Sequence, residues 1–290
     1  MKFDKLISDD NFKKYRGKYF DYSWYTFIID KNQDGYYVED GITKVLFKFR
    51  KNKINNSISK LAMDTFLEMS KKKHSNRGNA GGVSENGNAR HLTKTGQSEG
   101  NYTSSNISGY YDRPLREHRG ILKSNLGCRT TSFTMNNKDL WEKGIPFIKK
   151  CSKIYKELSP LHYSIQKNEI NKIHKDLRIK GTVFTTITSN YNWRTACHCD
   201  SGDFSKGLGN LIVLGNDFTG GYLGFPQFKV LIKVEPGDFL LMDVHQWHCN
   251  TKIKTKGDKS SFRLSFVMYI REDMKECKIP KKIKGTNYFI

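Results

Sequence analysis

The sequence after Lys180 consists of short strand-like segments separated by turns. Apolar, β-branched and aromatic residues gather in short runs, and Gly-Asn, Gly-Gly and Pro-Gly pairs separate these runs. Such runs favour strands, and such pairs favour tight turns. The predicted strands cover residues 182–188, 193–199, 211–214, 230–234, 239–242, 248–254 and 263–270. They predict a mainly β fold with flanking helices, in which a double-stranded β-helix, the jelly-roll form, closes over a site for a small molecule.

Helical patterns precede these strands. Residues 56–69 place apolar side chains at helical spacing, and residues 136–158 and 163–177 have similar patterns. Apolar positions three and four apart form one stripe of a helix that packs against other elements. We therefore expect three helices that buttress the outer sheet of the β core. Residues 128–134 are expected to add a strand beside it.

The run Cys197-His198-Cys199-Asp200 is a candidate metal site. Side chains two apart in an extended strand share a face, so His198 and Asp200 are expected to point one way and the two cysteines the other. His248, about 50 residues later, offers a third ligand. Two histidines and one carboxylate form the facial triad of non-haem Fe(II) oxygenases, whereas zinc usually takes a fourth ligand or a single water. We therefore interpret the cysteines as packing residues.

The segment from Arg263 to Arg271 is predicted to be a strand with one apolar face and one chemical face. With a period of two, the apolar face holds Leu264, Phe266, Met268 and Ile270, and the other face holds Arg263, Ser265, Tyr269 and Arg271 together with Val267. A guanidinium beside an open iron site suits bidentate pairing with a carboxylate. We therefore expect Arg263, together with Ser265, to bind the distal carboxylate of 2-oxoglutarate.

These elements follow one another as His-x-Asp, a histidine about 50 residues later and an Arg-x-Ser-x-x-x-Tyr strand. In this order they resemble the ferrous, 2-oxoglutarate-dependent dioxygenases of the TET/JBP kind, which oxidise the 5-methyl group of pyrimidines in DNA. The likeness covers residues 105 to 275 approximately and is greatest to viral and bacterial relatives. It includes Phe-Thr-Thr-Ile-Thr at 184–188 and Asn-Trp-Arg-Thr-Ala at 192–196.

The resemblance implies a cupin-like jelly roll that uses Fe(II), 2-oxoglutarate and dioxygen. The implied reaction is hydroxylation of 5-methylcytosine in DNA, or of thymine, by hydrogen abstraction and hydroxyl rebound on a base flipped out of the duplex. It also implies that His198, Asp200 and His248 are the metal ligands and the catalytic centre. His245, three residues before His248, competes for the role of third ligand, but the family pattern and the spacing to Arg263 favour His248.

The resemblance further implies substrate contacts. In these enzymes the tyrosine of the arginine-bearing strand and a histidine two residues later contact the flipped base. Tyr269 matches the tyrosine, but Arg271 stands at the histidine position. Asp203 stands three residues after the metal aspartate, where animal relatives have asparagine, and its carboxylate suits the amino group of cytosine. Arg129 is expected to contact either the substrate or an internal carboxylate.

The net charge of +21 and the pI of about 9.6 predict a polyanionic partner, because Lys and Arg neutralise phosphates in sequence-independent nucleic-acid binding. An AT-rich coding sequence, which enriches lysine, is the alternative explanation for this charge. DNA is therefore the expected partner on the combined grounds of motif and charge. Two other functions stay open: a prolyl or other protein side-chain hydroxylase with the same iron chemistry, and a non-catalytic DNA-binding module.

The chain is expected to have three parts. Residues 1–106 form a basic N-terminal extension with one helix and a Gly-, Asn- and Ser-rich loop. In this loop, residues 76–82 either close over DNA or the co-substrate, or belong to a solvated linker. Residues 107–275 form the catalytic domain with its buttressing helices, and 276–290 form a basic tail. No signal peptide, membrane span or disulfide framework is expected, so the protein is predicted to be intracellular, in the cytoplasm or nucleus, with reduced cysteines.

Overall fold

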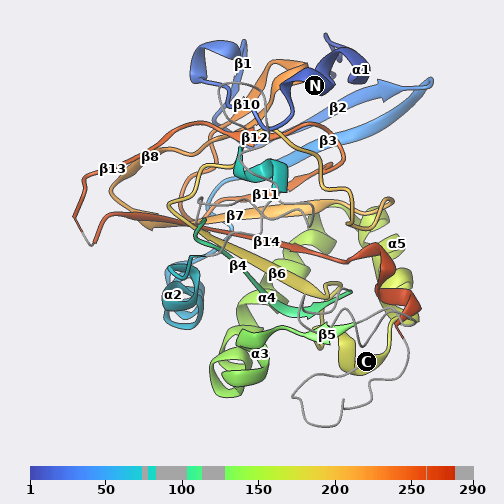
Figure 1. Ribbon diagram of the computed structural model, residues 1–290. Coiled ribbons are helices and arrows are strands. Elements are labelled where there is room, and N and C mark those ends of the chain that lie inside the picture. Colours follow the sequence, from blue (N-terminus) through green and yellow to red (C-terminus); the bar gives the residue numbers. More distant parts are fainter. Residues whose placement is uncertain (74–77, 83–102, 113–127, 259, 278–290) are drawn as a thin grey trace.

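The computed structural model describes residues 1–73, 78–82, 103–112, 128–258 and 260–277, which form two facing sheets with helices beneath the larger one (Figure 1). Within these residues the larger sheet has eight strands in the order β2-β3-β11-β7-β14-β6-β4-β5, and the smaller has four in the order β1-β10-β9-β12. β13 and β8 form a separate ribbon. The arrangement is the predicted jelly roll with flanking helices, so the predicted fold class is confirmed.

The strands are β1 Phe27–Ile29, β2 Gln33–Glu39, β3 Ile42–Arg50, β4 Ser105–Tyr111, β5 Arg129–Thr130, β6 Thr186–Tyr191, β7 Gly209–Asn216, β8 Phe218–Gly220, β9 Leu223–Phe225, β10 Val230–Ile232, β11 Phe239–Met242, β12 Cys249–Asn250, β13 Ile253–Thr255 and β14 Phe262–Tyr269. The α-helices are α1 Asp9–Phe12, α2 Asn56–Ser70, α3 Ser132–Asn136, α4 Lys138–Leu158 and α5 Pro160–Lys172. Short 3-10 turns are η1 Lys13–Tyr15, η2 Tyr22–Trp24, η3 Gly78–Gly81, η5 Lys175–Leu177, η6 Pro226–Phe228 and η7 Glu272–Glu276.

Helices α2 and α4 cover the outer face of the larger sheet, and the hydrophobic core between them and the sheet includes Phe66, Phe147 and Phe266. Helix α2 begins after Asn55, whose side chain accepts a hydrogen bond from the backbone N–H of Ile58 at 3.0 Å. Such a cap satisfies an N–H group that has no partner within the helix. The predicted supporting helix at 56–69 is therefore confirmed.

Strand β14 has the two faces that the sequence predicts. Leu264, Phe266 and Met268 are fully buried against the helices. Arg263 and Ser265 point to the opposite side and are also buried, with exposed fractions of 1% and 2%. Because alternate residues of a strand point to opposite faces, this single strand separates the helix-packed core from the space between the two sheets.

The N-terminal residues complete both sheets. β1 pairs in parallel with β10, and β3 pairs antiparallel with β11. An aromatic layer that includes Phe12, Phe20, Tyr25 and Trp247 packs against the smaller sheet. The smaller sheet is therefore covered on its outer face by this layer and on its inner face by the core between the sheets.

Several predicted strands differ from the structure. The strand predicted at 182–188 begins only at Thr186, and the one predicted at 248–254 consists of β12 and β13. Residues 193–199 form no regular strand, because Asn192 has a positive φ of 47° that turns the chain away from the end of β6. Residues 128–134 contain only the two-residue β5 before helix α3 begins. The helix predicted at 136–158 is confirmed as α4, which begins at Lys138 after α3 ends at Asn136.

The cysteines differ from the expectation of reduced thiols. Cys128 and Cys277 form a disulfide, with their Cα atoms 5.9 Å apart, so the expectation is wrong for this pair. These residues are 149 positions apart in sequence, and both belong to a hydrophobic cluster that includes Met274 of η7. Cys151, Cys197, Cys199 and Cys249 are free thiols. No helix in the described part of the chain has the length and apolar character that a membrane span requires.

Candidate metal centre and adjoining pocket

His198, Asp200 and His248 come together where the loop after β6 meets the start of β12. His198 and His248 exchange two backbone hydrogen bonds, of 3.1 and 3.0 Å, which hold their rings at a centroid distance of 4.4 Å. The backbone N–H of Asp200 donates to the carbonyl of Val244 at 3.0 Å. One potential ligand atom from each of the three residues lies within 4.8 Å of the others. This is the spacing of groups that surround one ion.

The hydrogen bonds around this cluster orient its ligand atoms. The Nδ1 atom of His198 contacts the carbonyl oxygen of Ala196 at 2.7 Å, and Nδ1 of His248 contacts that of Gln246 at 2.9 Å. An Nδ1–H that donates to a carbonyl leaves Nε2 with its lone pair free for a metal. The Nε2 atoms lie 3.4 Å (His198) and 3.8 Å (His248) from the Asp200 carboxylate oxygens.

The electrostatics also suit a cation. Burial, followed by the neighbouring His198, lowers the pKa of His248 to about 4, so its imidazole is neutral at pH 7. Burial alone would raise the pKa of Asp200, but the hydrogen bond and charge of His198 outweigh it and keep that pKa below its ordinary value. Neutral imidazole and ionised carboxylate are the forms that bind a metal. The donor set, two nitrogens and one carboxylate, fits the facial triad of Fe(II) oxygenases.

Arg263 is a buried cation with unused hydrogen-bond donors. Its Nη1 donates to the hydroxyl of Ser265 at 3.0 Å, whereas its Nε and Nη2 atoms have no partner among the described residues. Burial lowers its pKa to about 10, which leaves the guanidinium charged at neutral pH. An unpaired buried charge is costly and is normally matched by an anion. Two free N–H directions in one plane fit the two oxygens of a carboxylate.

Gly221 leaves room for this guanidinium and links it to the metal cluster. Its φ is +66°, and a Cβ atom at this position would lie 2.5 Å from Nε of Arg263. The side-chain amide of Asn250, two residues after His248, donates to the carbonyl of Gly221 at 3.1 Å. The metal cluster and the arginine are therefore supported by one continuous set of contacts.

Arg271 lies in a buried ion-pair network. Its Nε is 3.2 Å from Asp112, its Nη1 is 3.4 Å from Asp203, and its guanidinium lies 5.0 Å from the ring centre of Tyr111. Burial, and then the charge of Asp200, raise the pKa of Asp203 well above its ordinary value. Asp112 is not among the site residues predicted from the sequence. The need of a buried arginine for a buried carboxylate could have indicated such a partner, but not which residue it is.

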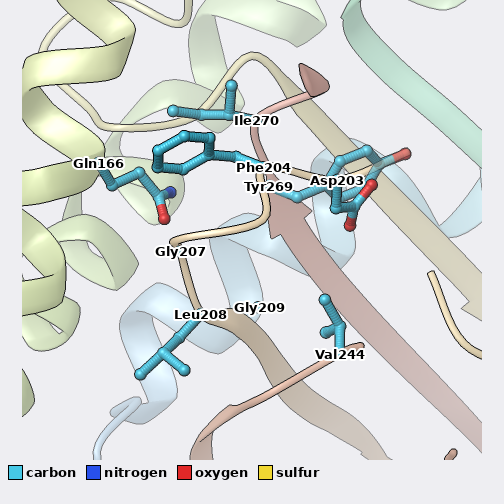
Figure 2. Close-up of a pocket in the computed structure, with 9 residues that line it drawn as sticks. All are labelled: Gln166, Asp203, Phe204, Gly207, Leu208, Gly209, Val244, Tyr269 and Ile270. Atoms are coloured by element: carbon cyan, nitrogen blue, oxygen red, sulfur yellow. The ribbon is translucent and has the colours of Figure 1, made fainter. Parts of the chain in front are cut away.

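The two other predicted substrate residues are Tyr269, which lines a pocket beside this network, and Arg129, which does not. Asp203 and Tyr269 line one small pocket together with residues that include Gly209 and Val244 (Figure 2). The hydroxyl of Tyr269 lies 3.0 Å from that of Thr188. Arg129 is outside this pocket lining, and its guanidinium lies 5.4 Å from the ring centre of Tyr111. The structure therefore brings Asp203, Tyr269 and Arg271 together and leaves Arg129 at the rim of the group.

Replacing Arg271 with methionine is expected to lower the free energy of unfolding by about 3–5 kcal/mol, because Asp112 and Asp203 are left buried without their cation. A carboxyl group whose pKa is higher in the folded than in the unfolded state destabilises the fold as pH rises above about 4. The loss should therefore be largest at neutral pH and shrink towards pH 4. Urea unfolding at several pH values measures it.

The exposed Lys60, which pairs with Asp64 on α2, gives a control for this experiment. Lys60→Met should change the free energy of unfolding by less than about 0.5 kcal/mol, since an exposed ion pair contributes little. An Arg271→Met variant as stable as the original protein at pH 7 would contradict the network.

Comparison with known proteins places these residues in context. A Tet_JBP family model, described as the oxygenase domain of the 2OGFeDO superfamily, matches residues 107–272, a range that includes the metal cluster and Arg263. Thymine dioxygenase JBP1 of Trypanosoma brucei brucei is 37% identical over 173 residues, which are 59% of this chain and 20% of that protein. The bifunctional helicase and thymine dioxygenase JBP2 of Leishmania tarentolae is 37% identical over 168 residues, or 57% of this chain and 14% of that protein.

The chain therefore spans about a fifth or less of the length of these two relatives. Among solved structures, NgTET1 in complex with 5mC DNA aligns with a TM-score of 0.55 at 14% identity, over 87% of this chain and 83% of that one. A likeness at this level of identity shows a shared fold.

Proposed function

Because the chain belongs to the Tet_JBP family of 2-oxoglutarate- and Fe(II)-dependent oxygenases, we propose that it hydroxylates the 5-methyl group of a pyrimidine base in DNA. The first candidate base is 5-methylcytosine, and thymine is the second. The relatives named above are thymine dioxygenases, and the structural relative was solved with 5mC DNA. Both findings support a 5-methylpyrimidine in DNA as the substrate.

The observation that carries the proposal is the pairing of two complementary sites. His198, Asp200 and His248 offer three ligand atoms to one ion, and Arg263 offers unpaired donors to a carboxylate. An Fe(II) ion held by three protein ligands keeps other coordination positions open for a co-substrate. Each of the two cofactors of the family therefore has a fitting site.

The residues of the chain would divide the work of the reaction between them. When bound, Fe(II) and 2-oxoglutarate would supply, with dioxygen as the oxidant, the chemistry that hydroxylates an unactivated methyl group. His198, Asp200 and His248 hold the metal through Nε2 and carboxylate oxygens. Arg263 and the hydroxyl of Ser265 orient 2-oxoglutarate, and the buried surroundings exclude water from the site.

The base would be held by polar groups at the other end of β14. Asp203 and Tyr269 line the small pocket, and Arg271 fixes Asp203 through their ion pair. An ionised Asp203 would accept a hydrogen bond from the exocyclic amino group of 5-methylcytosine, whereas the raised pKa of this carboxyl favours its protonated form. Thymine has a carbonyl oxygen there, and a protonated Asp203 would donate to it.

The test is to incubate the protein with Fe(II), 2-oxoglutarate and duplex DNA that contains 5-methylcytosine and thymine, and to analyse the digested nucleosides by mass spectrometry. A hydroxymethyl product that requires both cofactors is the expected result, and an Asp200→Ala variant should make none. If succinate forms but no nucleoside changes, the oxygenase chemistry stands and the DNA substrate is wrong. A protein side chain would then become the substrate to test.

A further inference from the structure

Residues 13–18, Lys-Lys-Tyr-Arg-Gly-Lys, form a dense cationic segment near the N-terminus. Lys13, Lys14, Arg16 and Lys18 are all exposed. The segment precedes residues 107–272, which match the family model, so the family resemblance says nothing about it. It follows α1 and leads into the aromatic layer that covers the smaller sheet.

The 13–18 segment is bonded to the chain segment that holds two of the proposed metal ligands. The backbone N–H of Gly17 donates to the carbonyl of Cys197 at 2.7 Å, and the N–H of Cys197 donates to the carbonyl of Lys18 at 2.8 Å. Cys197 directly precedes His198. The guanidinium of Arg16 lies 5.5 Å from the ring centre of Trp247, which directly precedes His248. The backbone of the 13–18 segment is therefore bonded to the residue before His198, and the side chain of Arg16 contacts the residue before His248.

Aromatic rings hold several of these cations in place. Lys14 and Lys18 lie 5.2 and 5.8 Å from the ring centre of Tyr15. The ring of Tyr15 packs in turn against Phe12, with centroids 5.0 Å apart. A cation already restrained by a ring loses less side-chain entropy when it meets a ligand.

Acidic residues near the segment leave most of its charge available. Asp10 pairs with Lys13 at 2.8 Å, and Asp21 pairs with Arg194 at 3.1 Å. Both pairs are exposed enough for water to screen them, so they hold their partners weakly. In the described part of the chain, Lys14, Arg16 and Lys18 form no ion pair.

Position distinguishes this segment from the other lysine-rich surface. Helix α4 also has exposed lysines, including Lys143 and Lys153, but it packs on the outer face of the larger sheet. That sheet separates α4 from the space that contains Arg263. The 13–18 segment, in contrast, combines exposed cations with backbone hydrogen bonds to Cys197, the residue before His198.

We propose that the 13–18 segment binds the sugar-phosphate backbone of the nucleic acid whose base enters the site. This inference rests on the proposed function and deepens it by naming a surface. A base that is flipped towards the metal centre keeps its flanking phosphates near the mouth of the site. Cations beside the chain of His198 would pair with these phosphates and position the strand without reading its sequence.

The test compares two variants in which four cations are replaced by glutamine. The first variant combines Lys13→Gln, Lys14→Gln, Arg16→Gln and Lys18→Gln. The second removes the same charge from α4 by Lys138→Gln, Lys143→Gln, Lys149→Gln and Lys153→Gln. Binding to a fluorescent duplex that contains 5-methylcytosine is followed by anisotropy, without added iron, over a series of salt concentrations.

The first variant should bind about tenfold or more weakly at 0.1 M salt. The magnitude of the slope of log K against log salt should fall by up to about 3.6, since each of the four phosphate contacts contributes about 0.9. The α4 variant should keep a slope close to that of the original protein. Equal losses of DNA affinity and salt dependence in both variants, or no such loss in the first variant, would overturn the proposal. So would an original protein that does not bind the duplex.

Two further measurements separate this proposal from a folding defect and from the proposed reaction. A Lys14→Gln and Lys18→Gln double variant leaves Arg16 on Trp247 and should show about half of the slope change, so a folding defect in the fourfold variant does not decide the question. Nucleoside analysis reports the chemistry independently. Product formation with an unchanged salt slope would refute the surface alone, whereas a reduced slope without any product would refute the proposed reaction alone.

Discussion

Replacing Arg263 with methionine is expected to abolish binding of 2-oxoglutarate while leaving the fold as stable as before or more stable. The two effects have one cause, because the guanidinium is buried with Nε and Nη2 unpaired within the described residues. Removing an unmatched buried charge relieves a desolvation cost, and methionine fills a similar volume. The same charge is the proposed partner of the co-substrate carboxylate. Its loss should weaken 2-oxoglutarate binding by at least about 100-fold, the usual scale for removing one partner of a buried charge pair.

Two measurements check this prediction. Anaerobic calorimetric titration of 2-oxoglutarate into the Fe(II)-loaded protein gives the affinity, and urea unfolding of the protein without ligand gives the stability. Arg178→Met is the matched control, since Arg178 bonds to the carbonyl of Ile170 on α5, outside the site. The control should bind 2-oxoglutarate normally. Unchanged affinity in Arg263→Met would show that the co-substrate carboxylate binds elsewhere.

Replacing His248 with alanine is expected to remove tight iron binding and nearly all turnover, whereas His245→Ala should retain both. The two histidines lie three residues apart but face different partners. Nε2 of His248 lies 3.8 Å from Asp200, and Nε2 of His245 lies 3.4 Å from the carbonyl of Phe204. Loss of a residue that only supports a ligand costs about 10–100-fold in metal affinity or activity, and loss of a ligand itself should cost more.

Iron content after dialysis and the rate of succinate formation measure this difference. The pair of variants separates the assignment of the third ligand from general damage to the loop that connects β11 to β12. If His245→Ala loses iron as completely as His248→Ala, the cluster of His198, Asp200 and His248 is not the sole determinant of the metal site. Similar unfolding midpoints for both variants would show that neither result comes from misfolding.

Local patterns in the sequence were sufficient for the core of the fold and for the candidate site. The period of two in residues 263–270 separates the helix-packed face of β14 from the face of Arg263, and the structure confirms that separation. The spacing of His198 and Asp200 predicted a shared side, and their side chains lie 3.4 Å apart. They do so although residues 193–199 are not a regular strand, because the backbone pairing with His248 fixes their direction.

Contacts between distant segments were not predictable in the same way. Asp112 meets Arg271, and Cys128 meets Cys277, only after the sheets and helices have packed. The aromatic layer over the smaller sheet was also not predicted, because Phe12 and Phe20 do not recur at the spacing of a helix or a strand. The predicted boundary at residue 106 between an extension and a catalytic domain stays a prediction, although β1 and β3 pair with strands of the later part of the chain.

The pairing of β1 with β10 and of β3 with β11 has a consequence for how the protein is made. Phe27 lies opposite Val230, so β1 leaves the ribosome about 10–40 s before its partner β10 at about 5–20 residues per second, and β3 likewise precedes β11. During that interval their aromatic side chains have no native surface to cover. Topologies with such distant contacts fold slowly. The protein should therefore depend on chaperones during synthesis more than a fold built from neighbouring hairpins.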